Sequence, residues 1–354
     1  MPTQFPQELL EELIDYLVAD SVSLKTCSLV SRAWVLRSRS HLFATCTLTP
    51  TNIRPFCDLL RASTFLPHVR IINASTDYWT QSDRYSNETA ADLRRLTGVR
   101  ALIITLNFLT TAASADAAFC TGLAMAFPSI TNLDITCRCE GYHSEAQSPP
   151  LFDLISLFPT LQELSVNAVA RFPQIMHAPP MVVPPPGLRR VCVGMPVAQP
   201  ILRWLHVANH LPNLEAIILP FLQWHEESMI RSQLRQLSGI HTLNICVSVS
   251  DDDPTTIFNL ALHPNLKTLG VTIFAGRGDL GRLIPLLSTL PTPALIEHFS
   301  LALHPHSIKT FEWGPLDEFL SPTRFPRLRS VVLTGHKSTD KTLPLLAARG
   351  LIQV

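Results

Sequence analysis

The chain has 354 residues, of which 46% are hydrophobic and 16% charged, and its acidic and basic residues balance to a net charge of zero. This length is enough for a large buried core and for more than one domain. The balanced charge argues against a nucleic-acid partner, and no apolar run reaches the ~18–20 residues of a membrane helix. The start of the chain lacks the pattern of a signal peptide, so we expect a soluble protein of the cytoplasm or nucleus.

The first forty-odd residues favour short amphipathic helices. Pro6 suits a first helical turn, because its missing N–H has no partner there in any case. Leu9, Leu13 and Leu17 recur at every fourth residue, and Leu10 widens the apolar stripe that they form. The spacing therefore predicts a first helix with one apolar face.

A second helix is expected after a cap at Ser23, with Leu24, Cys27 and Val30 spaced three apart. A third amphipathic stretch is expected to begin at Trp34. A helical unit this small buries too little apolar surface to be very stable alone. Exposed leucines and a tryptophan therefore suit a docking surface.

The segment resembles an F-box, the helical module that docks a protein onto the Skp-family adaptor of a cullin–RING ubiquitin ligase. The resemblance rests on FPQELL, which begins at Phe5, and on LVSRAW, which ends at Trp34. Phe5 stands where the family usually has leucine, and Ser31 where it often has cysteine. The resemblance implies that residues 1–46 bind the adaptor. The contacts carried over by motif match are Phe5, Pro6, Leu9, Leu10, Leu13, Leu17, Leu24, Val30 and Trp34.

From about residue 66 onward one unit recurs: an apolar residue, two variable ones, an apolar, one variable and an apolar. Its copies begin at intervals of 26 to 32 residues, at Val69, Val99, Ile130, Leu161, Leu188, Leu214, Ile240, Leu266, Ile296 and Leu328. The alternation predicts a short strand with one buried face. Proline or glycine just before most copies ends the preceding helix. Helices are expected between the strands, among them residues 151–158, 201–206, 229–234 and 283–287.

One strand and one helix per repeat resemble the irregular leucine-rich repeats that often follow an F-box. The expected fold class is therefore α/β: a short helical F-box, then residues 47–354 as an irregular leucine-rich-repeat-like solenoid of parallel strands with helices on the convex side. The usual polar ladder of Asn or Cys survives only at Asn107, and repeats of up to 32 residues exceed the usual length of ~20–29. The main alternative is a doubly wound α/β domain, which would show Gly-rich phosphate turns and less even spacing.

The residues between the apolar positions are expected to face outward and to form a recognition surface. They are mostly small, polar and uncharged. Those predicted to contact a target protein are Asn132, Asp134, Glu163, Asn167, Arg190, Asn244, Thr268, His298 and His336. For any one of them taken alone, the ordinary alternative is the solvated face of a sheet.

No other chemistry is favoured, so we expect no catalytic residue, cofactor or metal. The eight cysteines form no C-x-x-C pair and are expected to be reduced. The acidic run at 251–253 stands where helix caps are expected. His304 and His306 lack a third ligand, and there is no P-loop, dinucleotide fingerprint or Gly-x-Ser-x-Gly motif.

Together the two resemblances imply the substrate-recognition subunit of an SCF-type cullin–RING ubiquitin ligase, which is not itself an enzyme. Its partners would be the Skp-family adaptor with the cullin–RING core and an unidentified target protein, with no nucleic acid and no membrane. Outside that complex it is expected to be a monomer. Two alternatives stay open, an F-box scaffold without a ligase role and an enzyme on an α/β fold with an unrecognised site.

Overall fold

The computed structural model describes most of the chain, in two compact units. The described residues are 6–49, 51–62, 68–75, 87–107, 113–138, 151–168, 182–194, 197–219, 232–237, 239–248, 258–274, 283–303, 313–334 and 343–353. Unit 1 comprises Met1–Gln162 with Pro185–Gly187, and unit 2 comprises Glu163–Pro184 with Leu188–Val354. This division does not test the predicted domain boundary after residue 46, which stays a prediction.

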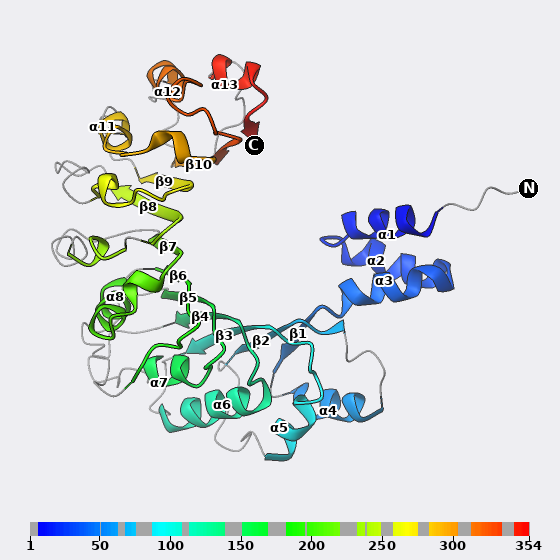
Figure 1. Cartoon of the computed structure of the whole chain (residues 1–354). Coiled ribbons are helices and arrows are strands. Elements are labelled where there is room, and N and C mark those ends of the chain that lie inside the picture. Colours follow the sequence, from blue (N-terminus) through cyan, green and yellow to red (C-terminus); the bar gives the residue numbers. More distant parts are fainter. Residues whose placement is uncertain are drawn as a thin grey trace, which may run out of the picture. The chain divides into compact units, whose positions relative to one another are not determined.

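Unit 1 contains three N-terminal helices followed by strands that alternate with helices (Figure 1). The first helices are α1 (Gln7–Tyr16), α2 (Ser21–Val30) and α3 (Arg32–Leu42). The strands are β1 (Thr45–Leu48), β2 (Ile71–Ser75), β3 (Ala101–Asn107) and β4 (Asn132–Arg138). The remaining helices are α4 (Ile53–Ala62), α5 (Asn87–Leu93), α6 (Ala113–Ala126) and α7 (Leu151–Ser156). Figure 1 shows α4, α5 and α6 on one side of the strands.

Unit 2 contains eight of the described strands, again separated by helices or single 3₁₀ turns. The strands are β5 (Glu163–Ala168), β6 (Arg190–Val193), β7 (Ala216–Leu219), β8 (Thr242–Ser248), β9 (Thr268–Phe274), β10 (His298–Leu303), β11 (Ser330–Thr334) and β12 (Ile352–Gln353). The helices are α8 (Ala198–Val207), α11 (Leu283–Ser288), α12 (Trp313–Phe319) and α13 (Pro344–Ala348). The 3₁₀ turns are η2 (Leu211–Asn213), η4 (Leu260–Leu262) and η6 (Pro293–Leu295).

Within each unit the strands are parallel and hydrogen-bonded in chain order. The ten strands predicted from the repeat are confirmed as β2 to β11, whereas β1 and β12 were not predicted. Helices α7, α8 and α11 confirm three of the expected helices, and of the fourth only residues 232–234 are described as helical. The α/β class is therefore confirmed, and the arrangement is consistent with a leucine-rich-repeat-like fold.

The core of both units is formed by the three apolar positions of the repeat. Every side chain at these positions is at most 4% exposed. In unit 1, for example, Leu102 lies opposite Leu133 and Ile104 opposite Ile135 in the register of β3 and β4. A shift of one residue would turn this whole set toward solvent, so burial fixes the register.

The residue directly before each of the strands β2 to β11, here called the pre-strand position, continues the ladder. The backbone N–H of Arg100 donates to the Arg70 carbonyl, and that of Thr131 to the Arg100 carbonyl, each at 2.9 Å. In unit 2 the Lys267 N–H donates in the same way to the His241 carbonyl at 2.9 Å. Side chains at successive pre-strand positions are therefore neighbours.

Polar side chains also connect one repeat to the carbonyls of the repeat before it. The donors and their acceptor carbonyls are Thr160 to Ile130 (2.7 Å), His210 to Leu188 (2.8 Å), His263 to Leu237 (3.2 Å) and Thr292 to Pro264 (2.7 Å). Such bonds satisfy carbonyls that would otherwise be buried without a partner. They supply contacts between repeats that the sparse Asn and Cys ladder does not. The side chain of Asn107, the one predicted ladder residue, lies outside the described part of the chain.

At the C-terminal end of unit 2, Asp317 of α12 caps the next helix. Its carboxylate is 3% exposed and accepts hydrogen bonds from Leu345 N at 2.8 Å and Leu346 N at 3.0 Å. These N–H groups belong to the first turn of α13, and N–H groups in a first turn have no acceptor within their own helix. The cap thus positions α13, and the Leu351 carbonyl that follows accepts from Val331 N at 2.8 Å.

Replacing Asp317 by Ala is expected to destabilise this end of unit 2 by about 2 kcal/mol or more, because two backbone N–H groups lose a buried acceptor. Asp317→Asn keeps one acceptor oxygen and should lie between the wild type and the Ala variant. Hydrogen exchange at the Val331, Leu345 and Leu346 amides measures the effect, with Ser321→Ala as a control. Unchanged exchange at these amides in Asp317→Ala would show that the cap is dispensable.

Burial lowers the pKa of His263 from its ordinary value of 6.5, despite the opposing effect of its bond to the Leu237 carbonyl. Below about pH 6.5 the unfolded chain binds a proton at His263, whereas His263 of the folded chain stays neutral. Stability is therefore lost as the pH falls below about 6.5. We expect the urea midpoint to fall less between about pH 7.5 and about pH 5.5 in His263→Asn than in the wild type. The same pH dependence in both proteins would assign the titration to other groups.

Candidate functional site

The first candidate surface lies on helices α1, α2 and α3, which share a very small interior. Ile14 and Leu24 are the large hydrophobic side chains buried there, and Ser38 of α3 is also buried. Helix α2 begins after Asp20, whose carboxylate accepts from Val22 N and Ser23 N at 3.1 Å each. The predicted cap at Ser23 is therefore wrong by three residues, because Asp20 competes for the same role and Ser23 Oγ itself donates to it.

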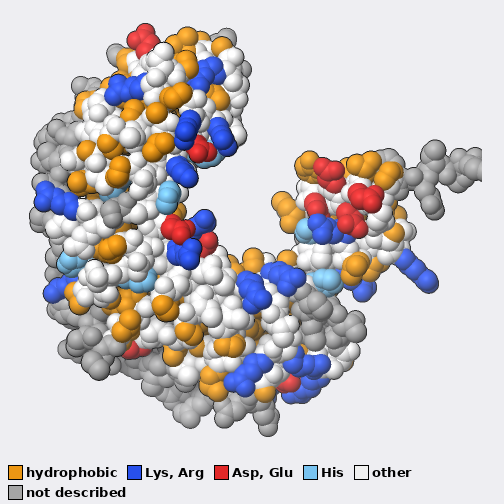
Figure 2. Space-filling model, in the orientation of Figure 1, with side chains coloured by type: hydrophobic (Ala, Val, Ile, Leu, Met, Phe, Trp, Pro, Cys, Tyr) orange, Lys and Arg blue, Asp and Glu red, His pale blue; other side chains and the backbone are white. Residues whose placement is uncertain are grey.

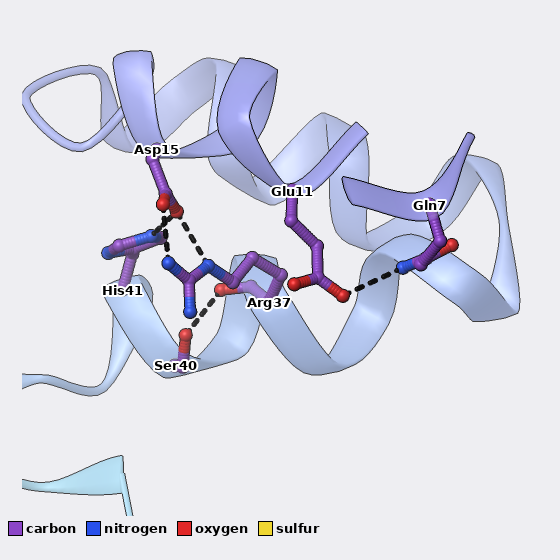
Figure 3. Close-up of polar contacts among 6 residues, drawn as sticks. All are labelled: Gln7, Glu11, Asp15, Arg37, Ser40 and His41. Carbon is purple, nitrogen blue, oxygen red and sulfur yellow. Dashed lines mark hydrogen bonds and ion pairs between the residues drawn. The ribbon is translucent and has the colours of Figure 1, made fainter. Parts of the chain in front are cut away.

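A polar cluster joins the end of α1 to α3 (Figure 3). Arg37 Nε donates to Asp15 Oδ1 at 2.6 Å, while Arg37 Nη2 contacts Asp15 Oδ2. His41 Nε2 lies 2.7 Å from Asp15 Oδ1. The bond with Arg37, and next that with His41, lowers the pKa of the Asp15 carboxyl to about 2. Asp15 is thus ionised over the whole ordinary pH range and bridges two helices that share little apolar core.

The segment from Pro6 to Phe43, which contains these helices, carries nine of the fifteen exposed large hydrophobic side chains of the described residues. Leu13 is 54% exposed, Val30 63% and Leu29 87%. The other exposed large hydrophobic residues of this segment are Leu9, Tyr16, Val18, Val22, Leu36 and Phe43. Figure 2 shows hydrophobic side chains over the α1–α3 part of the molecule, with acidic ones between them. An exposed set of this size on a small helical segment is typical of an interaction surface.

The predicted adaptor contacts fall into three groups. Pro6, Leu9, Leu13 and Val30 are exposed, whereas Leu10, Leu17 and Trp34 are half-buried. Leu24 is 1% exposed and packs in the interior, so its inclusion among the surface contacts needs correction. Phe5 lies outside the described residues. The exposure of Tyr16, Val18 and Leu36 was missed because a helical pattern alone does not say which helix covers which face.

The second candidate surface is formed by the outward side chains of the strands. Of the predicted target contacts, Asn132 and Asp134 lie on β4 in unit 1. The remainder lie in unit 2 on the strands β5, β6, β8, β9 and β10, and are Glu163, Asn167, Arg190, Asn244, Thr268 and His298. Arg190 and His298 are exposed, and the others are half-buried. In each strand these residues alternate with buried ones. His336 lies outside the described residues.

The structure brings some of these residues of unit 2 together. Arg190 Nη1 donates to Glu163 Oε1 at 3.1 Å, and Thr268 lies opposite His298 in the register. His298 Nδ1 is 2.8 Å from Ser330 Oγ. These contacts join each residue to its neighbour on the next strand. They link β5 to β6 and β9 to β10 and β11 through polar side chains.

Gly270 leaves room for polar side chains from the two neighbouring strands. In the register it lies between Asn244 of β8 and Ser300 of β10. A Cβ atom at this position would collide with Asn244 Oδ1 and Ser300 Oγ. The absent side chain therefore leaves space that polar groups from both neighbouring strands fill.

Ion pairs at the pre-strand positions of unit 2 were not predicted. Arg189 Nη1 lies 3.0 Å from Glu215 Oε1, and Arg329 Nη1 lies 3.6 Å from Glu297 Oε2. Exposed pairs of this kind contribute about 0–1 kcal/mol each, so their main effect is to neutralise the surface. The sequence signal was a charged residue directly after the first apolar residue of the repeat. Figure 2 shows side chains of both signs together over this part of the strands.

The structure also bears on metal and thiol chemistry. No group of three or more His, Cys, Asp or Glu side chains suited to a metal ion occurs among the described residues. The run at 251–253, His304 and His306 lie outside them. Burial raises the pKa of the Cys246 thiol to about 12, which leaves it protonated and unreactive.

Comparisons with known proteins add little. No protein-family model matches the chain, and no curated protein matches it. Among solved structures, a chain of the mouse RP105/MD-1 complex resembles it with a TM-score of 0.28 and 12% sequence identity. The match covers 78% of this chain and 58% of that one, which is less than two thirds of its length. At this TM-score the likeness carries no argument about function.

Among the helices of the described residues, none combines the length and the apolar character needed to span a membrane.

The ion cluster at Asp15 generates a pH prediction for the N-terminal helices. The folded pKa of about 2 lies below the ordinary value of 3.8, so the stabilisation is present above about pH 3.8 and is lost as the pH falls toward 2. Asp15→Asn should increase hydrogen exchange of the α1 amides at neutral pH, with a smaller difference from the wild type at about pH 3. Arg54→Gln, an exposed arginine of α4, is the control. Equal exchange of wild type and Asp15→Asn at neutral pH would show that the ion cluster does not stabilise α1.

Proposed function

We propose that helices α1, α2 and α3 form an F-box that docks onto a Skp-family adaptor. The observation that carries this proposal is the set of exposed hydrophobic side chains on these helices, which includes Leu9, Leu13 and Val30 of the motif. Exposing such a surface to water is unfavourable by about 25 cal/mol per Å² of apolar area, so a protein partner that covers it is expected to bind. The half-buried Trp34 and Leu10 would lie at the border of the contact.

On this proposal the chain is the substrate-recognition subunit of an SCF-type cullin–RING ubiquitin ligase. The outward faces of the parallel strands would hold a target protein while the cullin–RING core supplies the ubiquitin-loaded enzyme. The polar, largely neutral surface of unit 2 suits this role, because it offers hydrogen-bonding groups between rigid buried positions. The chain would perform no chemistry itself.

The docking test is co-purification of the full-length chain with the Skp-family adaptor. Leu13→Asp/Val30→Asp should reduce the recovered adaptor by about tenfold or more, because charged groups replace apolar contacts at the centre of the interface. Val207→Asp changes a hydrophobic residue of α8 that is still more exposed, at 75%, and is the control. Equal recovery of adaptor by the wild type and the double variant would refute the docking proposal.

The same preparation tests the ligase role separately. Cullin should co-purify with the wild type, and ubiquitylated proteins bound to the chain should decrease when cullin neddylation is inhibited. Adaptor and cullin binding without any such change would favour a scaffold role over a ligase role.

A further inference from the structure

Two arginines follow one another at the pre-strand positions of unit 1. Arg70 precedes β2 and Arg100 precedes β3, and both side chains are exposed. Arg70 Nη1 donates to the Gly98 carbonyl at 3.3 Å. Neither guanidinium forms an ion pair with a carboxylate of the described residues.

The same position is used differently in unit 2. There a basic residue has an acidic neighbour in an adjacent repeat, as in the pairs Arg189–Glu215 and Glu297–Arg329. Like charges on neighbouring strands are destabilising, whereas opposite charges attract. The repeat can therefore neutralise this position, and in unit 1 it leaves two positive charges side by side. An anionic group from a partner would relieve their repulsion.

Apolar residues directly follow these arginines in the two strands. Ile71 of β2 is opposite Ala101 of β3 in the register, and Ile103 follows two residues later. All three are half-buried, although they occupy outward positions that elsewhere carry mostly polar groups. A purely solvated face would be polar here. We call Arg70, Ile71, Arg100, Ala101 and Ile103 the β2–β3 patch.

We propose that the β2–β3 patch binds an extended acidic and aliphatic segment of a partner protein. Carboxylates of the segment would pair with the guanidinium groups of Arg70 and Arg100, whose planar fork suits two parallel hydrogen bonds. A branched aliphatic side chain would cover Ile103. The acidic residues would lie at the arginine end, because Ile103 stands two residues further along β3 than Ala101. In Figure 2 basic and hydrophobic side chains gather over the β1–β3 part of the chain.

A nucleic acid fits this patch less well. Single-stranded nucleic acids are bound by aromatic side chains on which bases stack, together with a basic groove. No outward position of β2, β3 or β4 among the described residues is aromatic. The apolar groups available are aliphatic and suit a peptide side chain. The segment would thus belong to a protein. That this protein is the target of the ligase rests on the proposed function.

The test begins with selection of a random peptide phage library on the immobilised full-length chain. Enriched peptides are synthesised with a fluorescent label and their affinities are measured by fluorescence polarisation. We expect them to combine Asp or Glu with Ile, Leu or Val, and to bind more weakly at high salt. Arg70→Glu/Arg100→Glu should weaken their binding by about tenfold or more, because charge-assisted hydrogen bonds are lost and repulsion replaces them.

Two further variants separate the parts of the patch. Ile71→Thr/Ile103→Thr keeps the β-branched shape of the strands and should also weaken binding, since it removes apolar contact. Arg203→Glu/Arg327→Glu reverses two exposed arginines outside the patch and should leave the affinity unchanged. All variants should unfold at the wild-type temperature.

The proposal is overturned if the enriched peptides lack acidic residues, if none is enriched over a blank surface, or if Arg70→Glu/Arg100→Glu binds them as the wild type does. Displacement of the peptides by a single-stranded RNA oligonucleotide would overturn it in favour of a nucleic-acid partner. Adaptor recovery by the patch variants is measured in parallel. In these variants, retained adaptor with lost peptide binding supports the patch. A wild-type chain that enriches acidic and aliphatic peptides but recovers no adaptor counts against the docking proposal alone.

Discussion

Burial of three apolar side chains in each repeat is the constraint on which the rest of the structure depends. A leucine or isoleucine moved from water into the core contributes about 1.5–3 kcal/mol, and a slip of one residue would forfeit the contribution of the whole strand. Because successive side chains of a strand point to opposite faces, the buried set also determines which residues face outward. The composition of the outward surface is thus a direct consequence of how the core is packed, and its side chains are free to vary in chemistry.

The N-terminal helices follow a different principle. Their interior contains little beyond Ile14 and Leu24, and the ion cluster of Asp15, Arg37 and His41 bridges α1 and α3. A charged clamp at a partly exposed site contributes modestly to stability, so these helices depend less on a core of their own. Their apolar surface faces solvent in the free chain. A partner that covered Leu13 and Val30 would supply the burial that the helices lack.

The sequence predicted the strands of the repeat but not its edges. The even spacing of apolar positions located β2 to β11, since period-two alternation and a preceding breaker are both local signals. β1 is four residues long and lacks a breaker, and β12 pairs through two residues only, so neither stood out. The ion pairs of Arg189, Arg190 and Arg329 depend on which residue of an adjacent repeat lies opposite each arginine. Repeat length varies, so this pairing emerges only when the register is known.

For the candidate surfaces, the limits of prediction were geometric. The helical motif named Leu24 as a contact, yet α2 turns this side chain inward, because its face is set by packing against α3. Likewise the pattern of outward residues singled out polar side chains and passed over Ile71 and Ile103, which alternation had marked as variable positions. These isoleucines become informative in the structure, because only the register shows that the strand starts at Arg70 and Arg100 are neighbours. Neither arginine has a carboxylate partner among the described residues. The β2–β3 patch differs from the surface of unit 2 in the charges on neighbouring strands. The patch has two arginines next to each other, whereas unit 2 has arginines paired with glutamates.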